Sequence, residues 1–390
     1  MSQTLKSETE FEFDGYIYIM PMMQSVSDLT AESEVAEIFF GNLTRLRLRP
    51  TINFSENSRL TVHYEIDMNF SEINMSFDDL EAFTGGLDIP GLKFSDISNR
   101  QAVDLSDDLY NNGKFTSKHY IDRFYYKHIF DWGEVVLGRQ RISWGVGRVW
   151  QPTDLFNPIN PANYSKFEKD GADAVSVKYF IGNFTDLELV YSFGNIWKDA
   201  DYGARFRTNY KKFDISLMSG YFDNRIVIGS DLAGDIIYGI GFRAEAIASF
   251  NESHADSNFV RAIAGLDYQF NADWYGVIEY QFNGEGRSCL NCAGAELFND
   301  FIRLIKGEIQ NLGRHYLTGL ISWKVGDLTS LSLNNITNLN DQSGFVGGGL
   351  SYSASDNINL KANAMFFYGD KMTEYSYYPN AAFLTFEYYF

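Results

Sequence analysis

The sequence predicts one all-β domain covering residues 1–390, an antiparallel up-and-down barrel of 18 strands that crosses a membrane, with 16 strands as the alternative. Three observations predict this fold. Apolar and polar residues alternate for about ten residues on both arms of a hairpin. Aromatic residues make up 16% of the chain, which suits the aromatic rims of membrane barrels. Tight turns and long connections alternate along the chain, as they do in such barrels.

The hairpin from Leu46 to Phe70 shows the clearest alternation. Its apolar face carries Leu46, Leu48, Ile52 and Phe54 on the first arm, and Leu60, Val62, Tyr64, Ile66, Met68 and Phe70 on the second. The other face is polar or charged throughout, and only Pro50 interrupts the apolar side. A period of two is that of a β-strand, and each arm is long enough to cross a bilayer when tilted.

The same pattern predicts the remaining strands. Seventeen strands are recognisable, the two hairpin arms and Glu10–Met20, His119–Phe130, Trp132–Ile142, Ala174–Ile181, Thr185–Phe193, Tyr202–Tyr210, Phe213–Phe222, Ile236–Glu245, Val260–Phe270, Trp274–Phe282, Tyr316–Val325, Thr329–Asn335, Phe345–Ser353, Ile358–Tyr368 and Ala382–Phe390. Both termini are expected on one side of the membrane, so the number must be even. Arg225–Gly229 is the candidate for the additional strand. Pro21–Asn42, Ser71–Ser117 and Gly145–Gly171 are expected to be long loops.

Composition argues against several classes of protein. The net charge of −19 disfavours nucleic acid as a partner. No run of about 18 apolar residues occurs, so a transmembrane helix is not expected. No signal peptide is visible at Met1, and we interpret the chain as mature sequence behind a start Met, because a barrel of this kind is exported. No nucleophile-elbow, P-loop or H-E-x-x-H motif occurs, so we expect no catalytic residues and no cofactor.

The strongest local motif runs from Gly138 to Gly145 as G-R-Q-R-I-S-W-G and continues through a loop rich in Asn and Pro. This stretch of about 25 residues resembles a motif of large Gram-negative outer-membrane barrels of the porin and alginate-export-like kind. In such families the loop after this strand can fold into the lumen and narrow it. The resemblance implies a constriction between Trp150 and Pro161, with Trp150, Asp154, Phe156 and Asn157 as candidates. The alternative is a rigid loop that only orders the rim.

The C-terminal strand resembles the assembly signal of outer-membrane barrels, with Leu384, Phe386, Tyr388 and the terminal Phe390 at alternate positions. The alternative is an ordinary last strand that ends in Phe. The resemblance implies a bacterial outer-membrane location, with membrane lipid and the barrel assembly machinery as partners. Whether a second copy of the chain or a periplasmic protein also binds is left open.

Charged residues recur on the polar strand faces. A charge that faces lipid costs up to roughly 2–4 kcal/mol near the bilayer midplane, so we expect these residues to face the lumen. The predicted pore-lining residues are Arg45, Arg47, Arg49, His63, Glu65, Asp67, Arg123, Lys127, Arg139, Arg141, Arg205, Arg207, Arg243 and Arg261, and Glu188, Glu245, Asp267 and Glu279 are expected beside them. Two interpretations are open: ion pairs that hold the wall together, or a basic stripe that favours anions.

Cys289 and Cys292 are the only cysteines, and they lie in a predicted long loop. No His follows Cys292, which excludes haem attachment of the C-x-x-C-H type, and no nearby His or second C-x-x-C completes a zinc site. A local disulfide in an oxidising compartment is therefore expected, and no metal. In the same loop, a repeat every four residues predicts a short amphipathic helix, formed by Leu297, Phe301, Ile305 and Ile309.

Together these observations favour an outer-membrane channel for the diffusion of small polar solutes, expected to be anionic. One alternative is an export barrel for an acidic polysaccharide, which would need a basic path. Another is a structural sleeve around an electron-transfer or secretion partner, which an 18-stranded lumen with large inner side chains would hold only tightly. An outer-membrane enzyme ranks last, because no Ser-His-Asp set can be identified.

Overall fold

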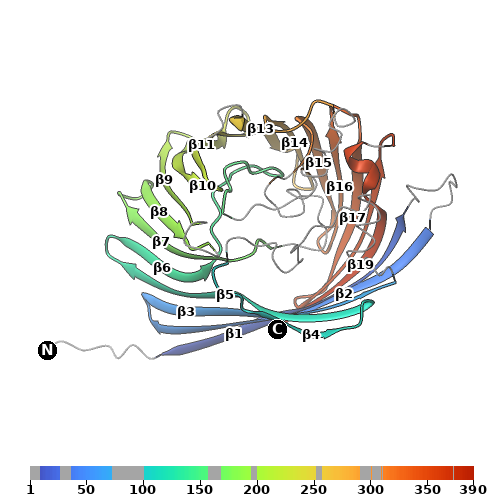
Figure 1. The fold of residues 1–390 in the computed structure, drawn as a ribbon, viewed down its shortest axis with the longest axis horizontal. Helices are drawn as coiled ribbons and strands as arrows, with labels where there is room; N and C mark the ends of the chain where they lie inside the picture. The colour runs from blue at the N-terminus through green and yellow to red at the C-terminus, as the bar shows by residue number, and fades with distance from the viewer. Residues whose placement is uncertain are drawn as a thin grey trace.

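Eighteen antiparallel strands form the wall of a closed barrel in the computed structural model (Figure 1). The structure describes residues 9–26, 37–72, 101–156, 168–194, 200–251, 257–289, 300, 309, 311–371 and 373–390. Wall strands pair with their neighbours in chain order, and β1 pairs with both β2 and β19, which closes the sheet. The prediction of 18 wall strands is confirmed.

The first half of the wall consists of β1 Glu10–Val26, β2 Glu37–Ser55, β3 Ser58–Ser71, β5 Phe115–Phe130, β6 Gly133–Gln140, β7 Ala172–Phe180, β8 Asp186–Ser192, β9 Asp201–Tyr210 and β10 Phe213–Phe222. The second half consists of β11 Arg225–Asp235, β12 Gly241–Phe250, β13 Phe259–Gln269, β14 Trp274–Asn283, β15 His315–Gly326, β16 Thr329–Asn338, β17 Gly344–Ser355, β18 Ile358–Tyr368 and β19 Asn380–Tyr389. A short strand, β4 Ser106–Asn111, pairs only with β5, and a 3-10 helix, η4 Glu374–Tyr377, precedes β19.

The start of β1 and the end of β19 lie at the same end of the barrel. The backbone N–H of Phe390 donates to the carbonyl of Gly15 near the start of β1, at the end where two-residue turns join β2 to β3 and β5 to β6. This end is called the tight-turn end, and the opposite one the long-loop end. The shared position of the start of the first strand and the end of the last strand agrees with the even number of strands expected from the sequence.

The barrel is apolar outside and polar inside. Leu217, Ile228 and Leu384 are 58%, 54% and 61% exposed on the outer surface, whereas Glu65 and Glu279 on the inner side are 2% and 1% exposed. Side chains alternate between the two faces of a strand, so the period-two pattern of the sequence places charged residues inside. An apolar exterior around a polar interior is the distribution that a barrel surrounded by lipid requires.

Several strand limits differ from the sequence prediction. Strand β1 continues through Pro21 to Val26, and β2 begins at Glu37, so much of the expected loop Pro21–Asn42 is wall. The additional crossing, β11, is 11 residues long rather than the short segment expected. In its second half Asp231 is 3% exposed and faces the interior, where a polar residue does not break the strand pattern. The expected strand start at Ile236 is wrong, because Ile236–Ile240 forms the turn before β12.

Within Ser71–Ser117, which was expected to be all loop, β4 and the start of β5 are strands. The helix expected from the four-residue repeat falls mostly on residues 301–308, which lie outside the described residues. Among the residues that the structure describes, no helix is long and apolar enough to cross a membrane.

Candidate functional site

The segment that follows β6, from Arg141 to Phe156, lies inside the barrel (Figure 1). Its backbone is held by carboxylates from the opposite part of the wall. Glu245 on β12 accepts the amide N–H groups of Val146 and Gly147 through Oε1, each at 2.5 Å, and that of Thr153 through Oε2 at 3.0 Å. The Thr153 hydroxyl also donates to Oε2, at 2.6 Å. One buried carboxylate therefore satisfies three amides of a segment that has no secondary structure of its own.

A second carboxylate holds the next part of the segment. Glu279 on β14 accepts the amide N–H of Arg148 at 2.9 Å and that of Trp150 at 2.7 Å. The indole N–H of Trp150 donates to the hydroxyl of Thr318 on β15 at 3.1 Å. Glu245 and Glu279 are 2% and 1% exposed, and hydrogen bonds from amides are the usual means of compensating a buried charge.

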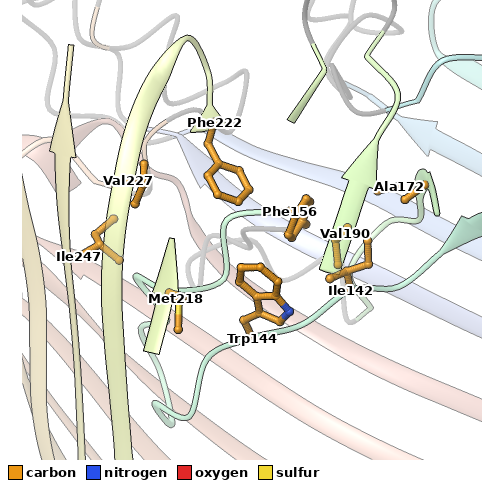
Figure 2. Close-up of a cluster of buried hydrophobic side chains, with 10 residues drawn as sticks. Ile142, Trp144, Phe156, Ala172, Val190, Met218, Phe222, Val227 and Ile247 are labelled. Carbon is orange, nitrogen blue, oxygen red and sulfur yellow. The ribbon is translucent and has the colours of Figure 1, made fainter. Parts of the chain in front are cut away.

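Aromatic packing fixes the two ends of the segment. Figure 2 shows Trp144 and Phe156 against Phe222, with ring centroids 5.0 Å apart for Trp144 and Phe156 and 4.9 Å for Phe156 and Phe222. The indole of Trp144 also donates to Glu188 on β8, at 3.0 Å. In the middle of the segment, the ring of Trp150 lies 5.7 Å from that of Tyr316.

A buried lysine joins the segment to the start of β7. The ammonium of Lys169 forms an ion pair with Asp154 and hydrogen bonds to Gln151 and Ser143. Burial, together with the positive charge of Arg141, lowers the pKa of Lys169 to about 8. Lys169 was not identified from the sequence, because a single lysine in a loop carries no pattern.

The constriction candidates lie within this segment. Trp150, Asp154 and Phe156 are 1%, 2% and 1% exposed, and Asn157 lies outside the described residues. The alternative of a loop that only orders the rim is wrong for 141–156, because this part contacts the inner wall at β8, β12, β14 and β15. We name residues 141–156 the lumen segment.

Most of the predicted pore-lining arginines and lysines are ion-paired. Arg45 donates hydrogen bonds to Asp67 through Nε and Nη2, at 2.7 and 2.8 Å, and Arg47 forms an ion pair with Glu65. The strand register places Arg45 directly opposite Asp67 and Arg47 directly opposite Glu65. Arg47 also reaches Asp122, Glu168 at 3.2 Å, and the ring of His63 at 2.8 Å. The remaining pairs are Arg49–Asp14, Arg123–Asp122, Lys127–Glu134, Arg205–Glu188, Arg207–Asp186, Arg243–Asp267 and Arg261–Glu285.

Arg139 departs from the expected position. It lies opposite Phe124 in the sheet register, and Phe124 is 48% exposed on the outer surface. Residues directly opposite in an antiparallel pair share a face, so Arg139 belongs to the outer side of the wall. Its guanidinium is nevertheless buried, because residues 101–105 cover it. The lumen-facing prediction for Arg139 is therefore wrong, and the charge rule failed because another part of the chain shields this arginine from lipid.

Arg141 differs from the other arginines. It is the first residue of the lumen segment, it is exposed, and among the described residues it has no ion-pair partner.

Cys289 is disulfide-bonded, while Cys292 lies outside the described residues, so the pairing of these two cysteines stays a prediction. No group of three metal-ligating side chains occurs in the part of the chain that the structure describes.

The comparisons with known proteins concern the fold. No protein-family model matches the chain, and no curated protein matches it by sequence. The structure is similar to a BenF-like porin from Pseudomonas fluorescens Pf-5, with a TM-score of 0.60 at 8% identity and 98% of each chain covered. The fold is that of a bacterial porin. It is also similar to OccAB4 of Acinetobacter baumannii (TM-score 0.56, 7% identity, 100% of each chain covered). OccAB2 of the same organism gives 0.55 at 10% identity, over 97% of this chain and 98% of the other.

Proposed function

We propose that this porin-fold protein is a channel of the bacterial outer membrane that passes small polar solutes and favours anions. The observation that carries the proposal is the lumen segment, which lies within a polar barrel interior and is anchored to the inner wall by Glu245 and Glu279. A porin needs such a fixed internal boundary to its aqueous path. The porin neighbours support a channel rather than an enzyme.

The preference for anions rests on few residues. The pairs Arg45–Asp67, Arg47–Glu65 and Arg205–Glu188 neutralise much of the basic stripe expected from the sequence. The exposed Arg141 has no such pair among the described residues, whereas the charge of the neighbouring Lys169 is balanced by Asp154. We therefore assign the anion preference to Arg141, at the point where β6 ends and the lumen segment begins.

The alternatives have less support. Most wall arginines are paired with carboxylates, which neutralise their charge. The barrel therefore lacks the continuous basic path that export of an acidic polysaccharide would need. A sleeve around another protein needs an empty lumen, whereas residues 141–156 of this chain lie there. On the channel proposal, the partners are membrane lipid and the assembly machinery, which would act on the strand ending at Phe390.

Planar-bilayer recording under a KCl gradient tests the proposal, with the reversal potential as the measurement. The wild type is expected to open as a channel whose reversal potential lies on the anion-selective side. Arg141→Gln should shift the potential toward cation selectivity. The matched control is Arg59→Gln, which removes an equal charge from an exposed position at the tight-turn end of β3.

Three outcomes would overturn parts of this proposal. A barrel that inserts but stays closed would refute the open channel. A cation-selective wild type would refute the anion preference. Equal shifts in the Arg141 and Arg59 variants would show that selectivity follows net charge and not the base of the lumen segment.

A further inference from the structure

A pocket of about 550 Å³ opens where β6 leaves the wall. Its lining is almost entirely apolar and includes Phe124 and Tyr191 from the wall, Phe193 directly after β8, and Val103 and Leu105 from the segment before β4. Val103 is 55% exposed, so this segment lies at the surface of the molecule. The lumen segment and the arginines discussed above, apart from Arg139, take no part in the pocket.

The strand register places the pocket on the outer side of the barrel. On β6, Gln140 faces inward, because its side-chain oxygen accepts a hydrogen bond of 2.9 Å from the hydroxyl of the inner-face residue Ser176. Leu137, three positions before Gln140, lies on the opposite face of the strand, is 53% exposed and faces outward. Phe124 and Tyr191 belong to the same outer face, since Phe124 lies opposite Arg139 and Tyr191 lies opposite Val175.

The pocket exists because β6 is short. Strand β5 has 16 residues and β6 only 8, so β6 covers only part of one edge of β5 before the chain turns into the lumen. Gly138, with φ +118°, allows the backbone to leave the regular strand there. Strand β4 pairs with the remaining edge of β5, and residues 101–105 cross the gap between β4 and β7.

Polar groups at the bottom of the pocket are satisfied. Arg139 bonds the carboxylate of Asp173 at 2.8 and 3.0 Å and the carbonyl of Ile121 at 2.9 Å, and it also bonds the carbonyl of Val103. The N–H of Val103 donates to Asp173 at 3.1 Å. The described lining therefore offers a polar ligand no vacant partner, and the ion pair has the additional hydrogen bonds that a buried charge needs in an apolar environment.

Aromatic side chains beside the pocket indicate its position along the membrane normal. Tyr191 stacks on Tyr202 with centroids 6.4 Å apart, and Tyr202 stacks on Tyr221 at 5.6 Å. All three rings are on the outer face near the long-loop end, and tyrosine rings in such a row are typical of the boundary between hydrocarbon and headgroups. The pocket thus opens toward the hydrocarbon just inside that boundary.

We propose that this pocket binds one hydrocarbon chain of a lipid from the outer leaflet. The inference rests on the proposed membrane location, because the apolar opening then faces lipid and not water. A hydrocarbon chain fits the apolar lining and shields the Arg139–Asp173 pair. In that position the lipid completes the wall at the point where β6 is missing.

Photolabelling in nanodiscs tests the proposal, with a phospholipid that carries a diazirine near the middle of one acyl chain as the probe. Labelled peptides are mapped by mass spectrometry. Leu217 and Ile228, both more than half exposed on the outer surface, are internal controls for general lipid contact. Labelling at Leu105, Phe124 and Tyr191 is expected to exceed that at the controls several-fold.

A matched pair of variants separates a bound chain from general exposure. Ala200→Trp fills the pocket, whose lining includes Ala200, and should reduce pocket labelling to the level of the controls. Ala204→Trp adds the same ring to the outer face of β9 away from the pocket, opposite Leu189, and should leave labelling unchanged. Labelling of the pocket at or below that of the controls in the wild type would overturn the lipid site. This outcome is also the one expected if another part of the chain fills the pocket. Absence of label at Leu217 and Ile228 would instead refute the membrane location.

Discussion

The carboxylate of Glu245 accepts the backbone N–H of Gly147 across the interior of the barrel, although the two residues are 98 positions apart in the chain. The same carboxylate bonds Val146 and Thr153, so one wall residue determines the path of the lumen segment.

Replacing this carboxylate should release the lumen segment. In Glu245→Ala the amides of Val146, Gly147 and Thr153 lose their acceptor, and each unsatisfied buried group costs about 1–3 kcal/mol. We expect a larger and noisier single-channel conductance, together with a lower unfolding temperature. Glu56→Gln, an exposed change in the turn between β2 and β3, is the control and should alter neither.

An independent substitution tests the same relationship without removing a charge. A Cβ at Gly147 would overlap the carbonyl of Trp150 and come within 2.5 Å of Cδ1 of Ile263, so Gly147→Ala should also displace the segment. Gly319→Ala is its control, because a Cβ there meets nothing within 4 Å. Wild-type conductance in both Glu245→Ala and Gly147→Ala would mean that the lumen segment does not border the conducting path.

The network around Arg47 should dominate the stability of the wall between β2 and β5. Arg47 is 1% exposed, and Arg47→Gln would remove a positive charge that is in contact with the buried carboxylates of both Glu65 and Asp122. Removing one member of such a buried network typically costs about 3–5 kcal/mol. Urea unfolding followed by intrinsic fluorescence measures the loss.

Arg49 provides the comparison, because its partner Asp14 has a side chain that is 55% exposed. Arg49→Gln should cost no more than about 1 kcal/mol, as is usual for surface pairs. Equal losses in the two variants would contradict the assignment of stability to the buried network.

Glu374 in η4, near the long-loop end, should make stability depend on pH. It is 2% exposed and accepts hydrogen bonds from the N–H of Leu312 and the amide of Asn338, each at 2.8 Å, and from the hydroxyl of Tyr316. Burial raises the pKa of Glu374 from 4.5 to about 7, and the negative charge of Asp341 acts in the same direction.

Between these pKa values the folded protein keeps a proton that the unfolded chain releases. The free energy of unfolding should therefore fall as pH rises from about 4.5 to about 7, by at most roughly 3 kcal/mol from this group. Unfolding temperatures measured across this range should fall less steeply for Glu374→Gln than for the wild type. Parallel pH profiles for the two proteins would assign the dependence to other groups.

Local patterns in the sequence predicted the wall well. The alternation in Leu46–Phe70 predicted the hairpin and ion pairs within the wall, because β-strand periodicity depends on neighbouring residues, and the strand register then sets Arg45 opposite Asp67 and Arg47 opposite Glu65. The even-number argument predicted β11 from a weak pattern, since both termini had to lie at one end of the barrel.

The site was less predictable, because its contacts are distant in sequence. Glu245 and Glu279 were expected to face the lumen, but nothing near them indicates that they bind backbone amides of residues 146–153. Thr318 likewise contacts Trp150 from 168 positions away. Arg139 was assigned to the wrong face for a related reason, since its cover comes from the separate segment 101–105.

The anchors of the lumen segment also set an order of events in folding. Residues 141–156 are synthesised before Glu245, Glu279 and Thr318, and they gain their partners only when β12, β14 and β15 have taken their places. Contacts this far apart in sequence form late and slowly. The inner partition of this barrel can therefore be completed only as the wall closes, so an unclosed intermediate would expose Trp144, Trp150 and Phe156 to its surroundings.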